Sequence, residues 1–311
     1  MAIFTVRHLT TYRYGREVAF GEHRMMLRPH DRQGQRLVNA KFTISPRPAA
    51  VRWINDVFGN TVALARFESR AARLRFDNSV RIDHAELDAL DFRIDEEALV
   101  YPFPYAADER FDLAPWIALD EADDGRELRR WVAQFLHRSG RTETGHLLMT
   151  LTNAIKESFA YVRRVSPGTQ RPTETLALRR GTCRDFATLM IAAVRSLGLA
   201  ARFVSGYLYV PSRDQEDGHR GGGSTHAWCQ VYLPGAGWTD FDPTNGIVGN
   251  RDLIGVAVAR EPRQAAPISG SFVGSMDDFV GLDVEVIVRR GDSEEVSAEP
   301  IDEDSVAGDR A

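Results

Sequence analysis

The sequence contains only two cysteines, Cys183 and Cys229, among its 311 residues. A chain so poor in cysteine does not depend on a disulfide framework, and two unpaired thiols favour a reducing compartment. No apolar run approaches the ~20 residues that a membrane-spanning helix needs. Residues 1–8 also lack the basic and apolar segments of a signal peptide. We therefore expect a cytoplasmic protein without a membrane partner.

Positive charge is not concentrated anywhere along the chain. The 39 lysines and arginines are scattered and are outnumbered by 44 aspartates and glutamates. The basic stripe with neighbouring aromatic residues that is typical of nucleic-acid-binding proteins is missing, so no nucleic acid partner is expected. Residues 292–311 contain eight acids and one arginine, a net of −7, so that the rest of a chain of net charge −5 carries +2. Residues 291–311 are therefore predicted to be an acidic, disordered tail.

Patterns of metal ligands are absent as well. The eight histidines form no cluster with cysteines at ligand spacing, and no loop has the alternating carboxylates that calcium needs. We expect neither a metal nor a cofactor. The glycine-rich segment 213–223, which includes His219, is interpreted instead as a flexible lid over a cleft.

One run of residues has the pattern of a helix that begins at a cysteine. Apolar residues recur at spacings of three and four from Phe186 to Leu197, and Gly198 follows in the position favoured for a C-cap. Cys183 is therefore in the first turn, where unpaired N–H groups and the helix dipole favour a thiolate. A cysteine is more often a small buried hydrophobe. Here the preceding Gly181 allows a close approach, and the Cys183 N–H could face an oxyanion.

A histidine lies at the start of a predicted strand, residues 225–233. Side chains alternate along this strand, so that His226 and Trp228 share one face while Cys229 belongs to the other, apolar face. Cys229 is therefore assigned a structural role in the core. His226 is the candidate base that would pair with the Cys183 thiolate.

An aspartate completes the set. Residues 233–237 have the pattern of a hairpin turn, and residues 238–242 form the returning strand, which Pro243 ends. The end of the second strand of a hairpin comes back level with the start of the first, so Asp242 can reach His226. It would accept the second ring N–H and stabilise the imidazolium. Asp240, two residues earlier on the same face, is the rival candidate.

The order of predicted elements indicates an α+β protein. Short alternating runs in residues 1–100 predict an all-β N-terminal domain, and the prolines of residues 101–124 indicate a linker. Helical patterns at residues 127–136 and 147–159 and the Cys183 helix come before the strands near residues 201–210, 227–233 and 238–242. Helices followed by an antiparallel sheet predict an α+β catalytic domain.

Five short motifs occur in this order: residues 172–176, 181–187, 206–207, 226–228 and 238–245. Their order and spacing resemble the transglutaminase-like superfamily, whose core is related to papain-type cysteine proteases. The resemblance implies a Cys, His, Asp triad at Cys183, His226 and Asp242. Residues 12–14, 27–29 and 55–60 also resemble the N-terminal region of bacterial members. We accordingly expect a transglutaminase-like catalytic domain at residues 125–290, which ends in a C-terminal strand extension.

The expected function is a thiol-dependent amide-bond hydrolase, a cysteine protease or amidase acting on a peptide or protein through an acyl-thioester. Either Tyr161 or Gln170 would supply the second oxyanion donor. A transglutaminase, which transfers the acyl group to an amine, is the first alternative, and a non-catalytic binding module is the second. The sequence predicts neither the residues that bind substrate nor the oligomeric state.

Overall fold

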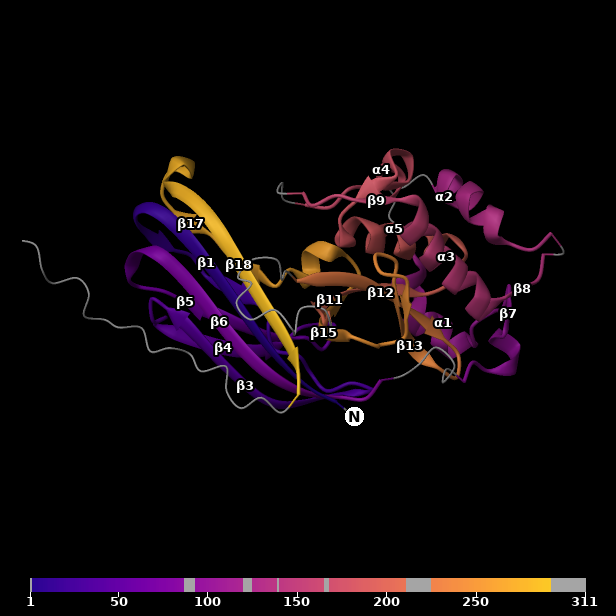
Figure 1. The fold of residues 1–311 in the computed structure, drawn as a ribbon, viewed down its shortest axis with the longest axis horizontal. Helices are drawn as coiled ribbons and strands as arrows, with labels where there is room; N and C mark the ends of the chain where they lie inside the picture. Colours follow the sequence, from indigo (N-terminus) through magenta and orange to yellow (C-terminus); the bar gives the residue numbers. More distant parts are fainter. Residues whose placement is uncertain are drawn as a thin grey trace, which may run out of the picture.

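A computed structural model gives the fold of the chain (Figure 1). The structure describes residues 2–86, 93–119, 125–138, 140–164, 168–210 and 225–291. The predicted lid at residues 213–223 and the tail at residues 292–311 lie outside the described residues. Two β-sheets occupy one end of the molecule, and a body of helices packed on a third sheet occupies the other (Figure 1).

The strand-rich end is built from two sheets, as the alternating N-terminal runs predict. β6 shows why these residues form strands, because Leu74, Phe76, Val80 and Ile82 point to one buried face at a period of two. One sheet has the order β17-β1-β6-β3, with β18 paired to β1, and the other has the order β16-β2-β5-β4. The strands are β1 (Ala2–Phe20), β2 (His23–Met25), β3 (Gln35–Ser45), β4 (Ala50–Asn55), β5 (Thr61–Arg66), β6 (Arg70–His84), β16 (Ile268–Ser269), β17 (Phe272–Val273) and β18 (Phe279–Arg290).

The C-terminal strand β18 runs alongside β1 over nearly its whole length (Figure 1). The pairing extends from Phe4 opposite Arg290 to Tyr14 opposite Phe279. Residues 279–290 are expected from the sequence to extend the catalytic domain, whereas the structure pairs them with the N-terminal sheet. β1 is bonded to β6 along one side, and β18 satisfies the backbone groups of its other side.

The other end of the molecule has the predicted α+β organisation. Its sheet is antiparallel, with the order β14-β13-β12-β11-β15. These strands are β11 (Ala201–Leu208), β12 (His226–Leu233), β13 (Gly237–Asp242), β14 (Ile247–Val248) and β15 (Leu253–Ala259). The helices are α1 (Ala107–Ile117), α2 (Gly125–Val132), α3 (Thr144–Ser158), α4 (Pro172–Leu178) and α5 (Cys183–Ser196). Short strand pairs join β7 (Val100–Tyr101) to β8 (Thr142–Glu143) and β9 (Ala160–Tyr161) to β10 (Arg180–Gly181).

Helix α1 lies in the segment that its prolines indicated as a linker. Leu113 of α1 is buried in the main core cluster, and Trp116 contacts Trp238 of β13 edge to face. Pro115 stands in the last turn of α1 and removes a single backbone hydrogen bond there, and α1 forms in spite of it. Part of residues 101–124 therefore packs on the catalytic body.

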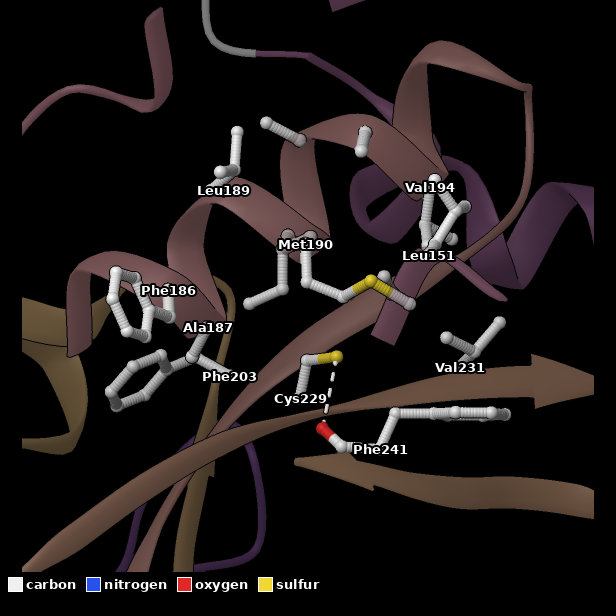
Figure 2. Close-up of a cluster of buried hydrophobic side chains, with 14 of the residues drawn as sticks. Leu151, Phe186, Ala187, Leu189, Met190, Val194, Phe203, Cys229, Val231 and Phe241 are labelled. Carbon is white, nitrogen blue, oxygen red and sulfur yellow. Dashed lines mark hydrogen bonds between the residues drawn. The ribbon is translucent and has the colours of Figure 1, made fainter. Parts of the chain in front are cut away.

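Helix α5 lies against one face of the sheet, above β12 (Figure 2). Phe186, Met190 and Val194 of α5 meet Phe203, Cys229 and Phe241 of the three central strands in one buried cluster. The Cys229 thiol is fully buried and donates to the Phe241 carbonyl oxygen at 3.4 Å. Burial raises the pKa of this thiol well above its ordinary value, so Cys229 is a core residue, as predicted.

The opposite face of the same sheet is covered in part by the N-terminal sheet. Tyr207 of β11 and Ile254 of β15 pack with Phe4, Val80 and other apolar residues of β1 and β6. A buried histidine of β1, His8, bonds to the Tyr207 hydroxyl at 3.0 Å. The two ends of the molecule therefore pack against each other through a hydrophobic interface.

Candidate active site

The start of α5 is fixed by a buried carboxylate. One oxygen of Asp185 accepts hydrogen bonds from the backbone N–H and the hydroxyl of Thr182, both at 2.8 Å. Thr182 is the N-cap, so this is a capping box that begins the helix at Cys183. The predicted position of Cys183 in the first turn is correct, and its backbone N–H is among those that have no partner within the helix.

The second oxygen of Asp185 anchors a neighbouring loop. It accepts from the Gln170 backbone N–H at 2.7 Å and from Arg164 at 3.0 Å. Asp185 has no exposed surface, and Arg164 compensates its charge. Gly181 makes room for this arrangement, because a Cβ there would come within 2.8 Å of the Asp185 Cβ. The same carboxylate thus positions both Cys183 and the backbone of Gln170.

His226 and Asp242 lie at the adjacent ends of β12 and β13. The His226 Nε2 atom is 2.8 Å from Asp242 Oδ2, and Asp242 has no exposed surface. Asp240, the rival candidate, instead accepts from Trp228 Nε1 at 2.6 Å and from Gln230 Nε2 at 2.8 Å. The structure therefore brings Asp242, and not Asp240, into contact with the histidine.

The imidazole also interacts with the Cys183 sulfur. Burial by itself would lower the pKa of His226, but the Asp242 charge and hydrogen bond outweigh it, and a hydrogen bond with Cys183 adds to them. Together they raise the pKa of His226 from 6.5 to about 10. Because Nε2 is engaged by Asp242, Nδ1 is the ring nitrogen left for the sulfur. The ring is thus an imidazolium at neutral pH, between the Cys183 sulfur and the Asp242 carboxylate.

Asn245 is a member of this site that the sequence did not reveal. Its side-chain amide donates to Asp242 Oδ2 at 2.6 Å and lies 3.3 Å from His226 Nε2. The backbone N–H of Thr244 donates to the other Asp242 oxygen at 2.9 Å. Burial would raise the pKa of Asp242, but His226 and these donors hold it below its usual range. In the sequence, Asn245 is marked only by its place at the end of the motif 238–245, three residues after Asp242.

An aromatic ring supports the histidine on the same strand. Trp228 is fully buried and stacks on His226, with ring centroids 5.9 Å apart and an interplanar angle of 25°. The hydrogen bond from Trp228 to Asp240 fixes the orientation of the indole. A cation over an indole face is stabilised by the ring quadrupole, so Trp228 also favours the imidazolium.

Both predicted oxyanion donors lie beside the start of α5. Tyr161 of β9 pairs with Gly181 of β10, and its side chain is 55% exposed. Burial, followed by the charge of Cys183, raises the pKa of Tyr161. The Gln170 side-chain oxygen accepts from the Thr175 hydroxyl at 3.1 Å, which leaves its NH₂ group as the donor. The structure brings both residues near Cys183.

Metal-binding clusters and membrane-spanning helices are both absent from the part of the chain that the structure describes. No three His, Cys, Asp or Glu side chains in that part of the chain come together as they would around a metal ion. No helix among the same residues has both the length and the apolar character needed to span a membrane.

Comparisons with known proteins agree with this architecture. Residues 130–243 match the transglutaminase-like superfamily, and residues 4–83 match the bacterial transglutaminase-like N-terminal region. An uncharacterized protein of Mycobacterium tuberculosis is 29% identical over 304 residues, which cover 93% of this chain and 94% of the relative. An uncharacterized protein of Mycobacterium leprae is 40% identical over 111 residues, 36% of this chain and 38% of the relative.

A solved structure supports the fold. A protein from Cytophaga hutchinsonii, whose name assigns it provisionally to the cysteine proteases, superposes with a TM-score of 0.69 at 18% identity. The match covers 94% of this chain and 92% of that protein. The predicted papain/transglutaminase-like fold and the family resemblance are therefore confirmed.

Proposed function

Residues 130–243 belong to the transglutaminase-like superfamily, and on that premise we propose that this protein hydrolyses amide bonds through Cys183, His226 and Asp242. The observation that carries the proposal is the buried His226–Asp242 hydrogen bond of 2.8 Å next to a cysteine that begins a helix. Cys183 and His226 are each 9% exposed, so the pair is desolvated without being sealed off from a substrate. Low local polarity strengthens the attraction between thiolate and imidazolium.

In the acylation step, the Cys183 thiolate attacks the carbonyl carbon of the amide. The new sulfur–carbon bond pushes the carbonyl electron pair onto oxygen, where the Cys183 N–H and one further donor stabilise the negative charge. Collapse of this intermediate breaks the carbon–nitrogen bond while the His226 imidazolium gives its proton to the leaving amine. The products are a free amine, a neutral imidazole and an acyl-thioester on Cys183.

In the deacylation step, the neutral imidazole takes a proton from water, and the hydroxide equivalent attacks the thioester carbon. The carbon–sulfur bond then breaks, which releases the carboxylic acid and restores the thiolate–imidazolium pair. Asp242 keeps its charge throughout, holds the tautomer of the ring and stabilises the imidazolium. Asn245 acts as a positioning residue through its bond to Asp242.

Hydrolysis is proposed over acyl transfer because water needs no second binding site. Transfer to an amine requires that a bound amine outcompete water for the same thioester. The substrate is proposed to be a peptide or protein amide, which the family membership suggests. We also propose a cytoplasmic location, because the two cysteines are free and a nucleophilic thiol is maintained by a reducing compartment.

Trapping of the acyl-enzyme tests the proposal. The full chain is mixed with unfolded casein in ¹⁸O-water, quenched with acid and digested, and the Cys183 peptide is analysed by mass spectrometry. We expect an acyl adduct on Cys183 and ¹⁸O in the new carboxyl groups of the product. Cys183→Ala should abolish both signals, whereas the matched control Cys229→Ala should retain them, because Cys229 lies under α5.

The same experiment separates the alternatives. A fluorescent primary amine is added to the mixture. Its attachment to casein glutamines, without ¹⁸O incorporation, would identify a transglutaminase. If the protein forms neither an adduct nor a product with any amide offered, it is a binding module, and the hydrolase proposal is withdrawn.

A further inference from the structure

A cavity of about 400 Å³ lies on the sheet β14-β13-β12-β11-β15, here called the core sheet, on the face that is turned away from α5. Arg202 of β11, Gln230 of β12 and Asp240 of β13 line it from three adjacent strands. Their neighbours Phe203, Cys229 and Phe241 point into the cluster under α5, so these three side chains point the other way (Figure 2). The cavity has the volume of a small-molecule site, ~300–1,000 Å³.

The remaining walls come from outside the core sheet. Arg32 and Gln33 are contributed by the loop before β3, and Arg93 by the segment that leads towards α1. The turn between β12 and β13 holds this segment, because the Asp95 N–H donates to the Pro234 carbonyl oxygen at 2.9 Å. Gly235 in the turn allows the close approach, since a Cβ there would come within 2.5 Å of the Arg93 carbonyl oxygen.

Three arginines, Arg32, Arg93 and Arg202, are among the lining residues, and Asp240 is the sole acid among the lining residues that the structure describes, so these residues carry a net charge of +2. Asp240 can balance only one of these three positive charges. Its Oδ1 atom already accepts from Trp228 and Gln230, and the nearest nitrogen of Arg32 is 3.8 Å away.

Two contacts hold the Arg202 side chain in place but leave its two terminal nitrogens without a hydrogen-bond acceptor among the described residues. Its Nε donates to the Gln230 side-chain oxygen at 2.8 Å, and its guanidinium lies 4.1 Å from the centroid of the Trp238 ring. The part of the chain that the structure describes provides no acceptor for its two terminal nitrogens. Burial, together with the nearby charge of Arg32, lowers the pKa of Arg202 to about 9 even though Asp240 opposes this.

Arg32 is also held by the surrounding fold, and Asp240, at 3.8 Å, is its only ion-pair partner among the described residues. Its guanidinium lies over Gly255, where a Cβ would come within 2.5 Å of the Arg32 Cζ. One terminal nitrogen is 3.5 Å from the Leu253 carbonyl oxygen, and the buried Nε has no partner among the described residues. A half-buried group of cations without matching anions is unfavourable unless a ligand supplies the missing charge.

We propose that this cavity binds a small molecule through an oxyanion group, a carboxylate or a phosphate, held by Arg32 and Arg202, with the exposed Arg93 adding positive charge to the lining. Guanidinium forks match the oxygen pairs of these two groups, and fixed side chains lose little entropy on binding. Asp240 links the cavity to the proposed active site, because it also orients the Trp228 ring that stacks on His226. The site does not require that Cys183 be catalytic.

Isothermal titration calorimetry of the full chain tests the proposal. Inorganic phosphate and citrate are titrated separately at low ionic strength, with glycerol as an uncharged control. We expect saturable binding of at least one anion, weakened about tenfold or more in Arg202→Gln, which removes a charged hydrogen-bond donor. Arg32→Gln should act in the same direction, and Asp240→Asn should tighten binding because it removes the competing carboxylate.

A matched control removes the same charge elsewhere. Arg36→Gln lies on β3, where Arg36 is 70% exposed and pairs with Asp83, so it should leave both affinities unchanged. Saturation by phosphate alone or by citrate alone would identify which oxyanion the site prefers. The proposal is overturned if neither anion saturates the wild type, if Arg36→Gln weakens binding as much as Arg202→Gln, or if Asp240→Asn does not tighten it.

Discussion

The replacement Asp242→Asn is expected to change the charge state of His226 at neutral pH. The Asp242 carboxylate is the strongest of the groups that raise the pKa of His226 to about 10, and it acts against the burial that lowers it. The variant keeps the shape of the side chain but removes its charge. Burial then dominates, so the pKa of His226 should fall below its ordinary value of 6.5.

The size of this change follows from the two pKa values. A pKa of about 10 in place of 6.5 means that the folded site favours the imidazolium by ~5 kcal/mol. Loss of this preference converts a ring that is fully protonated at pH 7 into one that is mostly neutral. The Cys183 thiolate would lose its cationic partner, and its reaction with an electrophile should slow accordingly.

Nuclear magnetic resonance of ¹⁵N-labelled histidine gives the assay. The His226 ring signals, assigned by comparison with His226→Gln, are followed from acid to alkaline pH in the wild type and in Asp242→Asn. Asp240→Asn is the matched control, because Asp240 bonds to Trp228 and Gln230 and should affect the ring much less. A wild-type ring that titrates near 6.5, or one that titrates alike in the wild type and in Asp242→Asn, would refute the reasoning.

Further predictions concern stability and packing. Because the pKa of His226 is raised, its stabilisation is complete below pH 6.5 and is lost as the pH rises through about 10. Because the pKa of Asp242 is lowered from 3.8, its stabilisation is present above that value and is lost as the pH falls through the lowered pKa. Urea unfolding of the wild type should therefore show a fall in the free energy of unfolding at both limits, and Asp242→Asn should lack the fall at the alkaline limit. Asp185→Ala leaves Arg164 unpaired and removes the capping box, so we expect a loss of ~3–5 kcal/mol in the same assay; a loss under ~1 kcal/mol would contradict the assigned role. Cys229→Ala creates a small cavity under α5 and should cost ~1–2 kcal/mol, while the alkylation rate of Cys183 stays unchanged. A change in the alkylation rate of Cys183 in that variant would contradict the claim that the two thiols act independently.

The three proposed catalytic residues could be predicted from the sequence because each depends on local structure. The period of apolar residues after Cys183 and the left-handed Gly198, which follows the C-cap Leu197, define α5. A tight turn between β12 and β13 determines the register, and the register decides which residues meet at the open end of the hairpin. His226 and Asp242 are 16 residues apart and follow from these two patterns.

The features that the sequence did not reveal depend on contacts between distant segments. The pairing of β18 with β1 joins residues about 280 positions apart, and nothing in the alternation of either strand names its partner. The bond from Asn245 to Asp242 depends on the path of one turn after Pro243. The arginines that line the cavity, Arg32, Arg93 and Arg202, come from three distant parts of the chain, so they could not be recognised as a group from the sequence.

The most direct test of the account is the rate at which iodoacetamide alkylates Cys183 at pH 7 in the wild type and in His226→Ala. Mass spectrometry follows both cysteines, with the buried Cys229 as an internal reference that should stay unlabelled. We predict fast labelling of Cys183 in the wild type and a decrease of about tenfold or more in the variant, because the imidazolium that stabilises the thiolate is removed. Equal rates in the two proteins would contradict the claim that Cys183 and His226 form a nucleophilic pair.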